Sequence, residues 1–510
     1  MIRADRIALV IACVAIAASY LVALRVFELL PHIEDEMAYV WQAQVLATGK
    51  LTLTSPPDPQ SIMIPFVVDY HGQRFGKYPL GWPLLLATGL LLHAGDWVNP
   101  ILAGLDAWLI YCLGKKLFGE RVGLLAEVLT VSSPFFLMNS GSLLSHPWAL
   151  FLSLSFALAW LDTFAPAGLR NGLAGETAPD PVRAPIWLTV LVAGLSLGVL
   201  AMTRPLTALG VALPFFFHGA FLLVRGDRSV RAHVLMTGLL AAAVAALVPL
   251  WQYAVTRDAL LNPYTLWWKY DKVGFGPGFG NEPGGHNLFW AAINLQFSLE
   301  AGWGDFFGWN GVSWLFLPFG LIALGKNVRG WLVTLVFPSI ILLYTTYWIG
   351  STLYGPRYYY EGFYSLSILT AAGIFWLGER VFKAGALRKW MQLAVTLLVL
   401  FLLGNNLFDY LPKRLEEMTD LYGINRTMLE PFATPLASQQ VPALVVVHFQ
   451  KVWTEYGGLL DLENPELTSP FIFALARDPA SDAMLAQDYP DRHVVYYYTD
   501  TPDAFYDSPR

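Results

Sequence analysis

Long apolar runs separated by short polar segments dominate the first 410 residues of the chain. A run of about 20 apolar residues can cross the hydrocarbon core of a bilayer as a helix. A shorter run, 80–95, begins Pro79-Leu80-Gly81-Trp82-Pro83, and we predict that it lies flat as a juxtamembrane helix. The pattern therefore predicts an all-α polytopic membrane domain over residues 1–410. It has about 11 expected spans, at residues 7–27, 98–114, 122–138, 146–164, 186–203, 205–224, 232–254, 311–325, 331–349, 357–378 and 388–408.

Residues 411–510 follow a different pattern, with short β-rich runs and intervening segments typical of helices. The runs Ala443–Phe449, Phe471–Ala474 and His493–Tyr498 are rich in β-branched and aromatic residues and predict strands. This region holds 15 Asp and Glu against 7 Lys and Arg, a net charge of −8, whereas the whole chain carries −6. We predict a small soluble α/β domain, and its acidic excess argues against a nucleic-acid partner.

Composition and the placement of charge predict how the chain sits in a membrane. The chain is 55% hydrophobic and 14% charged, whereas soluble domains carry about 25% charged residues. Basic residues such as Lys115, Arg121 and Arg228 gather in short loops on one side of the predicted spans, and that side is cytoplasmic by the positive-inside rule. We expect an integral, multi-pass protein of the cell (inner) membrane. Its N-terminus is then cytoplasmic, its C-terminal domain extracytoplasmic, and its long outer loops are 28–97 and 255–310.

Polar residues suited to group transfer gather on the predicted outer side. A carboxylate can deprotonate an acceptor hydroxyl, and Lys or Arg can hold a departing phosphate. These groups are Asp35 and Glu36 after the first span, Arg74 and Lys77 before the flat segment, Arg204 at a turn between two spans, and Arg357 with Tyr358 at the start of the tenth span.

Each cluster also has a purely structural interpretation. Asp35 and Glu36 suit the first turn of a helix, where the dipole is positive. Lys77 can snorkel at the membrane interface, and Arg357 can pair with Glu361 one helical turn later. The position of all the clusters on one face favours a site.

Four short motifs occur in an order that resembles a known family. Asp35-Glu36-x-x-Tyr39 resembles the first outer-loop motif of the GT-C membrane glycosyltransferases, which include the protein O-mannosyltransferases and the aminoarabinose transferases of lipid A. Lys77-Tyr78-Pro79-Leu80, Thr203-Arg204-Pro205 and Gly355-Pro356-Arg357-Tyr358 resemble their later motifs in the same order. The resemblance extends over about residues 1–405 and implies a GT-C-like fold.

The resemblance also implies roles for individual residues. Asp35 would be the catalytic base, with Glu36 beside it shaping the acceptor site. Lys77, Arg357 and Tyr358 would bind the donor phosphate. Further residues of a possible substrate site are Arg74, Tyr39, His146 and Arg204. His146 stands where these families often carry an acidic residue, and the second outer loop has no room for the inserted β domain of the protein mannosyltransferases.

Together these features predict a glycosyltransferase. It would move one sugar, with inversion, from a polyprenyl-phosphate donor to a lipid, glycan or protein acceptor at the outer membrane face. No cofactor is certain, and a divalent metal is compatible with the sequence but not required by it. The alternative is a transporter or lipid flippase, for which polar groups within the spans, such as Asp106 and Glu127, are the main evidence.

Overall fold

Helices form where the sequence has long apolar runs. The computed structural model of the chain describes residues 3–164, 184–380, 385–450 and 453–510. Within them, 6 helical segments are long and apolar enough to cross a membrane, and up to 7 if a bent pair is one span. The 6 segments are α1 (Arg3–Arg25), α7 (His146–Phe164), α8 (Ile186–Thr203), α9 (Pro205–Arg225), α10 with α11 (Arg228–Ala245 and Leu247–Thr256), and the segment Ala386–Gly423 that begins with α18 (Ala386–Asn405).

The expected count of about 11 spans is not confirmed, because several apolar runs are broken or polar. Helices α5 (Glu120–Val131) and α6 (Pro134–Gly141) meet at an angle of 61°, since a proline there cannot continue the preceding helix. Helix α4 (Val98–Phe118) is long enough, but Asp106 and two lysines lower its apolar character, and polar residues do the same in α17 (Phe363–Arg380).

Two other expected spans are short helices. The run 331–349 forms α15 (Val328–Thr334) and α16 (Val336–Tyr344). The run 311–325 forms only α14 (Leu317–Leu324), whose 8 residues are too few to cross a bilayer. The apolar runs thus located many of the helices and overestimated their continuity, but they did not predict the helices Glu34–Ala47 and Leu288–Asp305 in the outer loops.

The first outer loop contains helices and a small sheet. Helix α2 (Glu34–Ala47) packs against α3 (Gly81–Leu91), which has 11 residues, too few to cross a bilayer, and occupies the segment expected to lie flat. Between them, β1 (Leu53–Thr54), β3 (Gln73–Gly76) and β2 (Val67–Tyr70) form an antiparallel sheet that the sequence pattern did not predict. His71 and Gly72 connect β2 to β3 with φ of 50° and 76°, as a tight hairpin turn requires.

The second outer loop and the chain after α16 lie close to these elements. Helix α12 (Tyr264–Trp267) packs against β2, and α13 (Leu288–Asp305) follows a glycine-rich stretch. The backbone N–H of Gly274 donates to the carbonyl of Thr346, 2.8 Å away. The single-turn helix η3 (Arg357–Gly362) then leads into α17. Loop 255–310 is therefore attached to the segment that carries Arg357.

The C-terminal region contains the predicted sheet. Its strand order is β5-β4-β6-β7, with β4, β5 and β6 parallel and β7 antiparallel to β6. The three strands expected from β-rich runs are confirmed, and β7 is additional. The elements after α18 are η4 (Asn406–Tyr410), α19 (Leu411–Glu416), η5 (Leu421–Gly423), η6 (Arg426–Ala433), α20 (Pro435–Ser438), β4 (Ala443–His448), α21 (Thr454–Gly457), η7 (Gly458–Leu462), β5 (Phe471–Leu475), α22 (Pro479–Asp488), β6 (His493–Tyr498) and β7 (Phe505–Tyr506).

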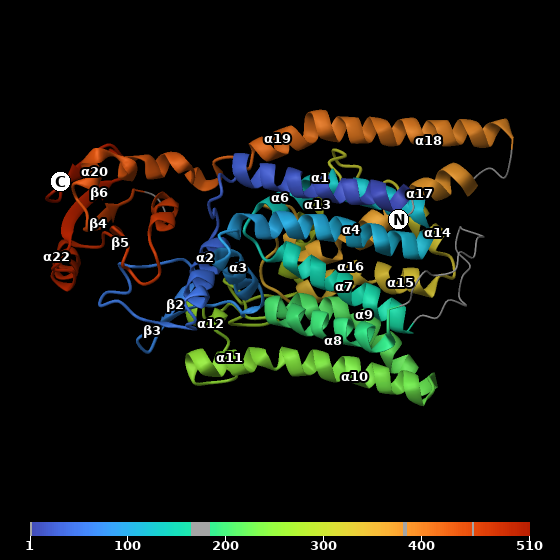
Figure 1. Cartoon of the computed structure of the whole chain (residues 1–510), viewed down its shortest axis with the longest axis horizontal. Helices are drawn as coiled ribbons and strands as arrows, with labels where there is room; N and C mark the ends of the chain where they lie inside the picture. The colour runs from blue at the N-terminus through green and yellow to red at the C-terminus, as the bar shows by residue number, and fades with distance from the viewer. Residues whose placement is uncertain (1–2, 165–183, 381–384, 451–452) are drawn as a thin grey trace.

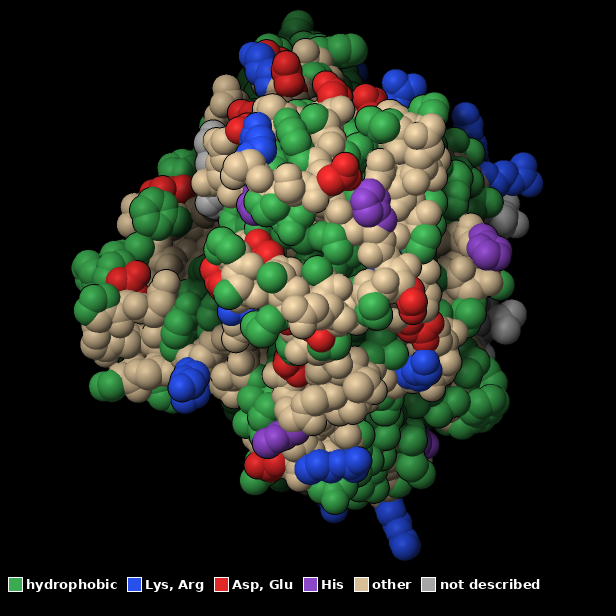
Figure 2. All heavy atoms as spheres, turned by 90° about the vertical axis from the view of Figure 1, so that its left-hand side faces the viewer, with side chains coloured by type: hydrophobic (Ala, Val, Ile, Leu, Met, Phe, Trp, Pro, Cys, Tyr) green, Lys and Arg blue, Asp and Glu red, His purple; other side chains and the backbone are tan. Residues whose placement is uncertain are grey.

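This α/β region lies at the end of the helical bundle where α2, β2 and β3 are found, and the N-terminus of the chain lies toward the other end (Figure 1). Ile424 is buried in a cluster with Met37 and Trp41 of α2, and its carbonyl oxygen is 2.9 Å from Nε2 of His32. Figure 2 views the molecule from this end, where acidic side chains are scattered among hydrophobic and neutral polar ones. The start of α2 is therefore enclosed between the bundle and the C-terminal region.

Candidate active site

Asp35 lies in the first turn of α2 and joins segments that are distant in sequence. Its Oδ1 accepts a hydrogen bond from the Tyr78 hydroxyl at 2.6 Å. Its Oδ2 forms an ion pair with Nη2 of Arg357 at 3.2 Å. The structure therefore brings the predicted base into contact with one of the predicted phosphate-binding residues.

The environment of Asp35 favours its charged form. Burial by itself would raise the pKa of this carboxyl, but Arg357, the Tyr78 hydroxyl and Lys77 together lower it below its ordinary value. The same burial lowers the pKa of Lys77, while Asp271 and Asp35 oppose that decrease. Asp35 is thus ionised at neutral pH.

Glu36 has a different environment, although it is adjacent to Asp35. Its side chain is 1% exposed. Its Oε1 accepts the backbone N–H of Leu143 at 2.7 Å, and its Oε2 accepts those of His32 at 2.8 Å and Ile33 at 3.3 Å. Burial raises the pKa of this carboxyl, and His32 with the backbone donors opposes the increase. Glu36 therefore ties the start of α2 to the loop after α6.

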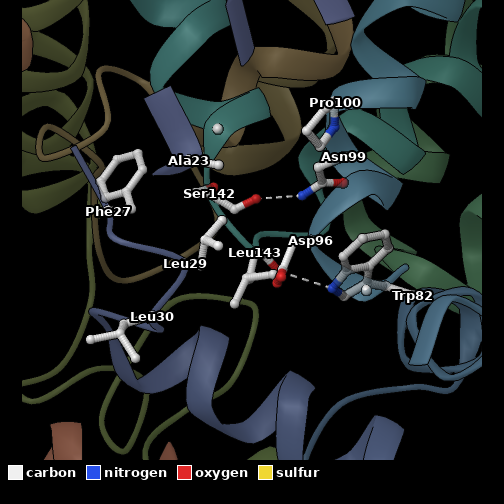
Figure 3. Close-up of a pocket in the computed structure, with 12 residues that line it drawn as sticks. Ala23, Phe27, Leu29, Leu30, Trp82, Asp96, Asn99, Pro100, Ser142 and Leu143 are labelled. Carbon is white, nitrogen blue, oxygen red and sulfur yellow. Dashed lines mark hydrogen bonds between the residues drawn. The ribbon is translucent and has the colours of Figure 1, made fainter. Parts of the chain in front are cut away.

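A small pocket lies beside that loop, lined by Phe27, Trp82, Asn99 and Leu143 among others (Figure 3). Trp82 Nε1 donates to the Leu143 carbonyl at 3.1 Å, and Asn99 Nδ2 donates to the Ser142 carbonyl at 2.7 Å. None of the predicted site residues lines this pocket. Its hydrogen bonds hold α3, α4 and the α6–α7 loop together, which supports the loop that Glu36 binds.

Lys77 lies in a buried aromatic cage. Its Nζ is 3.4 Å from the ring centroid of Phe66, and the rings of Tyr264, Trp268 and Tyr78 lie at 4.9, 5.1 and 5.4 Å. Aromatic faces attract cations, and the attraction strengthens when water is excluded. Lys77 also pairs with Asp271, whose Oδ2 is 3.2 Å away, and the two side chains are 3% and 1% exposed.

Arg204 and Arg357 both lie near the ring of Tyr358. The guanidinium carbons are 5.8 and 5.7 Å from its centroid. Nη1 of Arg357 is buried and has no hydrogen-bond partner among the described residues, whereas Nη2 holds Asp35. Nη2 of Arg357 thus pairs with the predicted base Asp35, and Nη1 is placed to donate a hydrogen bond to a bound anion.

Glu361 organises a second buried network. Its Oε1 lies 3.2 Å from Nε of Arg204 and 3.0 Å from Nδ1 of His146. Arg204 also donates through Nη1 to the Ser145 hydroxyl at 3.4 Å, and Tyr39 reaches the same hydroxyl at 3.3 Å. The structural interpretation in which Arg357 pairs with Glu361 is not what the structure shows, because Glu361 pairs with Arg204 and His146 instead.

Arg74 is separated from the other predicted residues. Its Nη2 donates to the Ile62 carbonyl at 3.2 Å, and its guanidinium lies 5.5 Å from the ring of Trp41. Burial lowers the pKa of Arg74, and Glu463 of the C-terminal region opposes the decrease. Successive side chains of a strand point to opposite faces, and Arg74 is an odd number of residues from Lys77. The two side chains therefore diverge, and Arg74 faces the C-terminal region.

Acidic groups elsewhere do not join the site. Asp106 and Glu127 are fully buried in α4 and α5, and their carboxyl oxygens have no hydrogen-bond partner within the described ranges. In the part of the chain that the structure describes, no group of three or more His, Cys, Asp or Glu could hold a metal ion.

Sequence reasoning missed Tyr78, Asp271, Tyr347 and Trp348 as parts of this cluster. Tyr78 belongs to the motif Lys77-Tyr78-Pro79-Leu80, next to Lys77. Asp271 is a carboxylate at the end of the aromatic stretch Trp267-Trp268-Lys269-Tyr270, and an acid among aromatic residues is a signal for a buried partner.

Comparison with known proteins gives the fold its context. No protein-family model matches the chain, and no curated protein does so. The structure of ArnT from Cupriavidus metallidurans bound to undecaprenyl phosphate has a TM-score of 0.56 at 12% identity, over 96% of this chain and 89% of that chain. Archaeal oligosaccharyltransferase AglB from Archaeoglobus fulgidus, in complex with an inhibitory peptide and a dolichol-phosphate, has a TM-score of 0.50 at 12% identity, over 96% and 69%. The chain is thus an integral membrane protein that shares its fold with these solved structures of GT-C glycosyltransferases.

Proposed function

We propose that the protein is a glycosyltransferase that moves one sugar from a polyprenyl-phosphate donor to a lipid, glycan or protein acceptor. The observation that carries this proposal is the position of Arg357. Its Nη2 holds the carboxylate of Asp35 at 3.2 Å, and its Nη1 is buried with no hydrogen-bond partner among the residues that the structure describes. A carboxylate that can act as a base and a hydrogen-bonding group that can bind an anion therefore lie at one site. Displacement of a phosphate by a hydroxyl requires both.

In the proposed reaction, Asp35 accepts the proton of the acceptor hydroxyl. The acceptor oxygen attacks the anomeric carbon from the face opposite the phosphate. The bond between that carbon and the phosphate oxygen breaks, and the configuration inverts. The lowered pKa of Asp35 keeps it ionised at neutral pH, so it is available to accept the proton.

Lys77 and Arg357 supply positive charge for the departing phosphate, and Tyr358 lies between Arg357 and Arg204. Preorganised cations stabilise charge that develops on a leaving group, more strongly where water is excluded. The bilayer would hold the polyprenyl tail. We assign Glu36 and Glu361 positioning roles, because their carboxylates are committed to protein groups.

We also assign the end of the molecule that carries α2 and the C-terminal region to the outer face. Lys115 lies at the other end, where its Nζ is 2.7 Å from Asp5 near the N-terminus. Basic residues on that side support a cytoplasmic N-terminus in the cell (inner) membrane. The C-terminal domain, 411–510, is then extracytoplasmic.

Two lines support a transferase over a transporter or flippase. The charged pairs Asp35–Arg357 and Lys77–Asp271 involve α2 and the outer loops, whereas a transporter site is expected near the bilayer midplane. Two solved structures that share the fold, those of ArnT and AglB, were obtained with undecaprenyl phosphate and a dolichol-phosphate bound.

The test is transfer of label from a panel of radiolabelled polyprenyl-phosphate sugars by the purified full-length protein. Label is followed into lipid, glycan and protein fractions. The exposed carboxylate Asp69 offers a matched control, because Asp69→Asn changes an acid outside the site. Transfer that survives Asp35→Asn, or no transfer from any donor in the panel, contradicts the proposal.

A further inference from the structure

Three hydrogen-bond donors converge on the carboxylate of Asp271. Lys77 Nζ lies 3.2 Å from its Oδ2, and the Tyr347 hydroxyl and Trp348 Nε1 lie 2.7 and 3.1 Å from its Oδ1. Asp271 is 2% exposed. The donors come from the end of β3 and from the segment after α16, and the acceptor comes from the second outer loop. The donors therefore form a buried cradle for an anion, which a side chain of the same chain now fills.

The cradle is continuous with the active site described above. Lys77 and Asp35 influence each other electrostatically. The ring of Tyr347 lies 5.8 Å from that of Tyr358, and Tyr358 lies between the two arginines. A phosphate seated on Lys77, Tyr347 and Trp348 would be next to the charges that the reaction needs.

A phosphate and the Asp271 carboxylate cannot share this cradle. Both are anions that use the same donors, and like charges in contact within a buried site repel strongly. Occupation by one therefore requires departure of the other. Buried pairs of this kind contribute little net stability once desolvation is included, so exchange for a ligand phosphate is energetically accessible.

A backbone contact holds the segment that carries Asp271 next to Tyr347. Gly274 follows Asp271 with φ of 139°, a conformation that residues with a Cβ rarely adopt. The Gly274 N–H donates to Thr346, next to Tyr347, at 2.8 Å. Release of Asp271 would therefore disturb this backbone contact, which gives its movement a measurable signature.

We propose that Lys77, Tyr347 and Trp348 form the subsite for the donor phosphate, and that Asp271 occupies it as an internal competitor until the lipid phosphate displaces it. This proposal rests on the proposed function and adds two phosphate-binding residues and a gating residue to it. When no lipid phosphate is bound, Asp271 would thereby keep the buried charge of Lys77 paired.

The test measures binding of undecaprenyl phosphate, without a sugar, to the full-length protein in detergent. Asp271→Asn removes the competing charge with little change of shape, so the Kd should fall about 5-fold or more, as expected when an occluded state no longer competes. Tyr347→Phe and Trp348→Phe should each raise the Kd about 3- to 10-fold through loss of one donor to an anion. Asp258→Asn, in the same loop but outside the cradle, is the matched control and should leave the Kd unchanged.

A second measurement needs no variant. Amide hydrogen exchange of residues 270–276 in the unmodified protein should accelerate when undecaprenyl phosphate binds, because Asp271 leaves its donors. Weaker or unchanged binding of undecaprenyl phosphate by folded Asp271→Asn, or slower exchange in this segment, overturns the proposal that Asp271 competes with the lipid phosphate. If the unmodified protein does not bind the lipid phosphate at all, the proposed function fails as well, so the two failures are distinguishable.

Discussion

Near-isosteric amide substitutions at the adjacent acids Asp35 and Glu36 should have opposite consequences. In Asp35→Asn, Oδ1 can still accept the Tyr78 hydroxyl. The lost ion pair with Arg357 joins side chains that are 23% and 16% exposed, and partly exposed pairs contribute about 1 kcal/mol or less. The variant should therefore fold normally. Removal of a general base should lower turnover by roughly 10²–10⁴-fold, which is about 3–5 kcal/mol in the activation barrier.

Glu36→Gln should mainly reduce stability. The new amide nitrogen cannot accept hydrogen bonds, and it must face either the Leu143 N–H or those of His32 and Ile33. The better orientation leaves one buried donor unsatisfied, which costs about 1–3 kcal/mol. The turnover of the molecules that remain folded should be close to that of the unmodified protein, because Glu36 holds the backbone and does not meet the acceptor.

Label transfer and thermal unfolding of the same purified samples separate these outcomes. Asp35→Asn should unfold at the temperature of the unmodified protein and transfer little label. Glu36→Gln should unfold at a lower temperature and transfer label in proportion to its folded fraction. Normal turnover in Asp35→Asn, or a folded and inactive Glu36→Gln, would refute this division of roles.

Further predictions address charge, sidedness and the C-terminal region. Arg357→Ala should raise the pKa of Asp35, since Arg357 now lowers it. Activity needs ionised Asp35 and falls as the pH drops through its pKa, so the acidic limb of the pH–rate profile should move to higher pH. No shift would mean that another group controls that limb. Lys77→Ala should slow transfer by about 2–4 kcal/mol in barrier, and unchanged single-turnover kinetics would place the phosphate elsewhere. A reporter fused after Arg510 should be active only in an extracytoplasmic compartment, and cytoplasmic activity would reverse the topology. Deletion of 411–510 should lower the unfolding temperature, because this region packs on α2. A folded truncation that has lost donor binding would show that the region supplies part of the donor site.

Local pattern in the sequence determined most of the helices of the bundle and the parallel strands of the C-terminal sheet, but not the small sheet β1-β3-β2 or helix α13. Apolar periodicity acts over a few residues, so it located the transmembrane helices and the three parallel strands of the C-terminal sheet. It overestimated continuity where a proline prevents one helix from continuing into the next, as between α5 and α6, because the length of an apolar run does not show where its helix breaks.

Only the tertiary structure decided which charges meet. Sequence spacing allowed a structural interpretation in which Arg357 pairs with Glu361, and it placed Arg74 in the same outer-face cluster as Lys77. In the fold, Arg357 holds Asp35, and Arg74 turns toward the C-terminal region. The aromatic stretch before Asp271 indicated a buried acid but did not identify Lys77 as its partner, although the two are buried together. The physical reason is that a buried charge must find a partner wherever chain packing places one, and that partner can be hundreds of residues away.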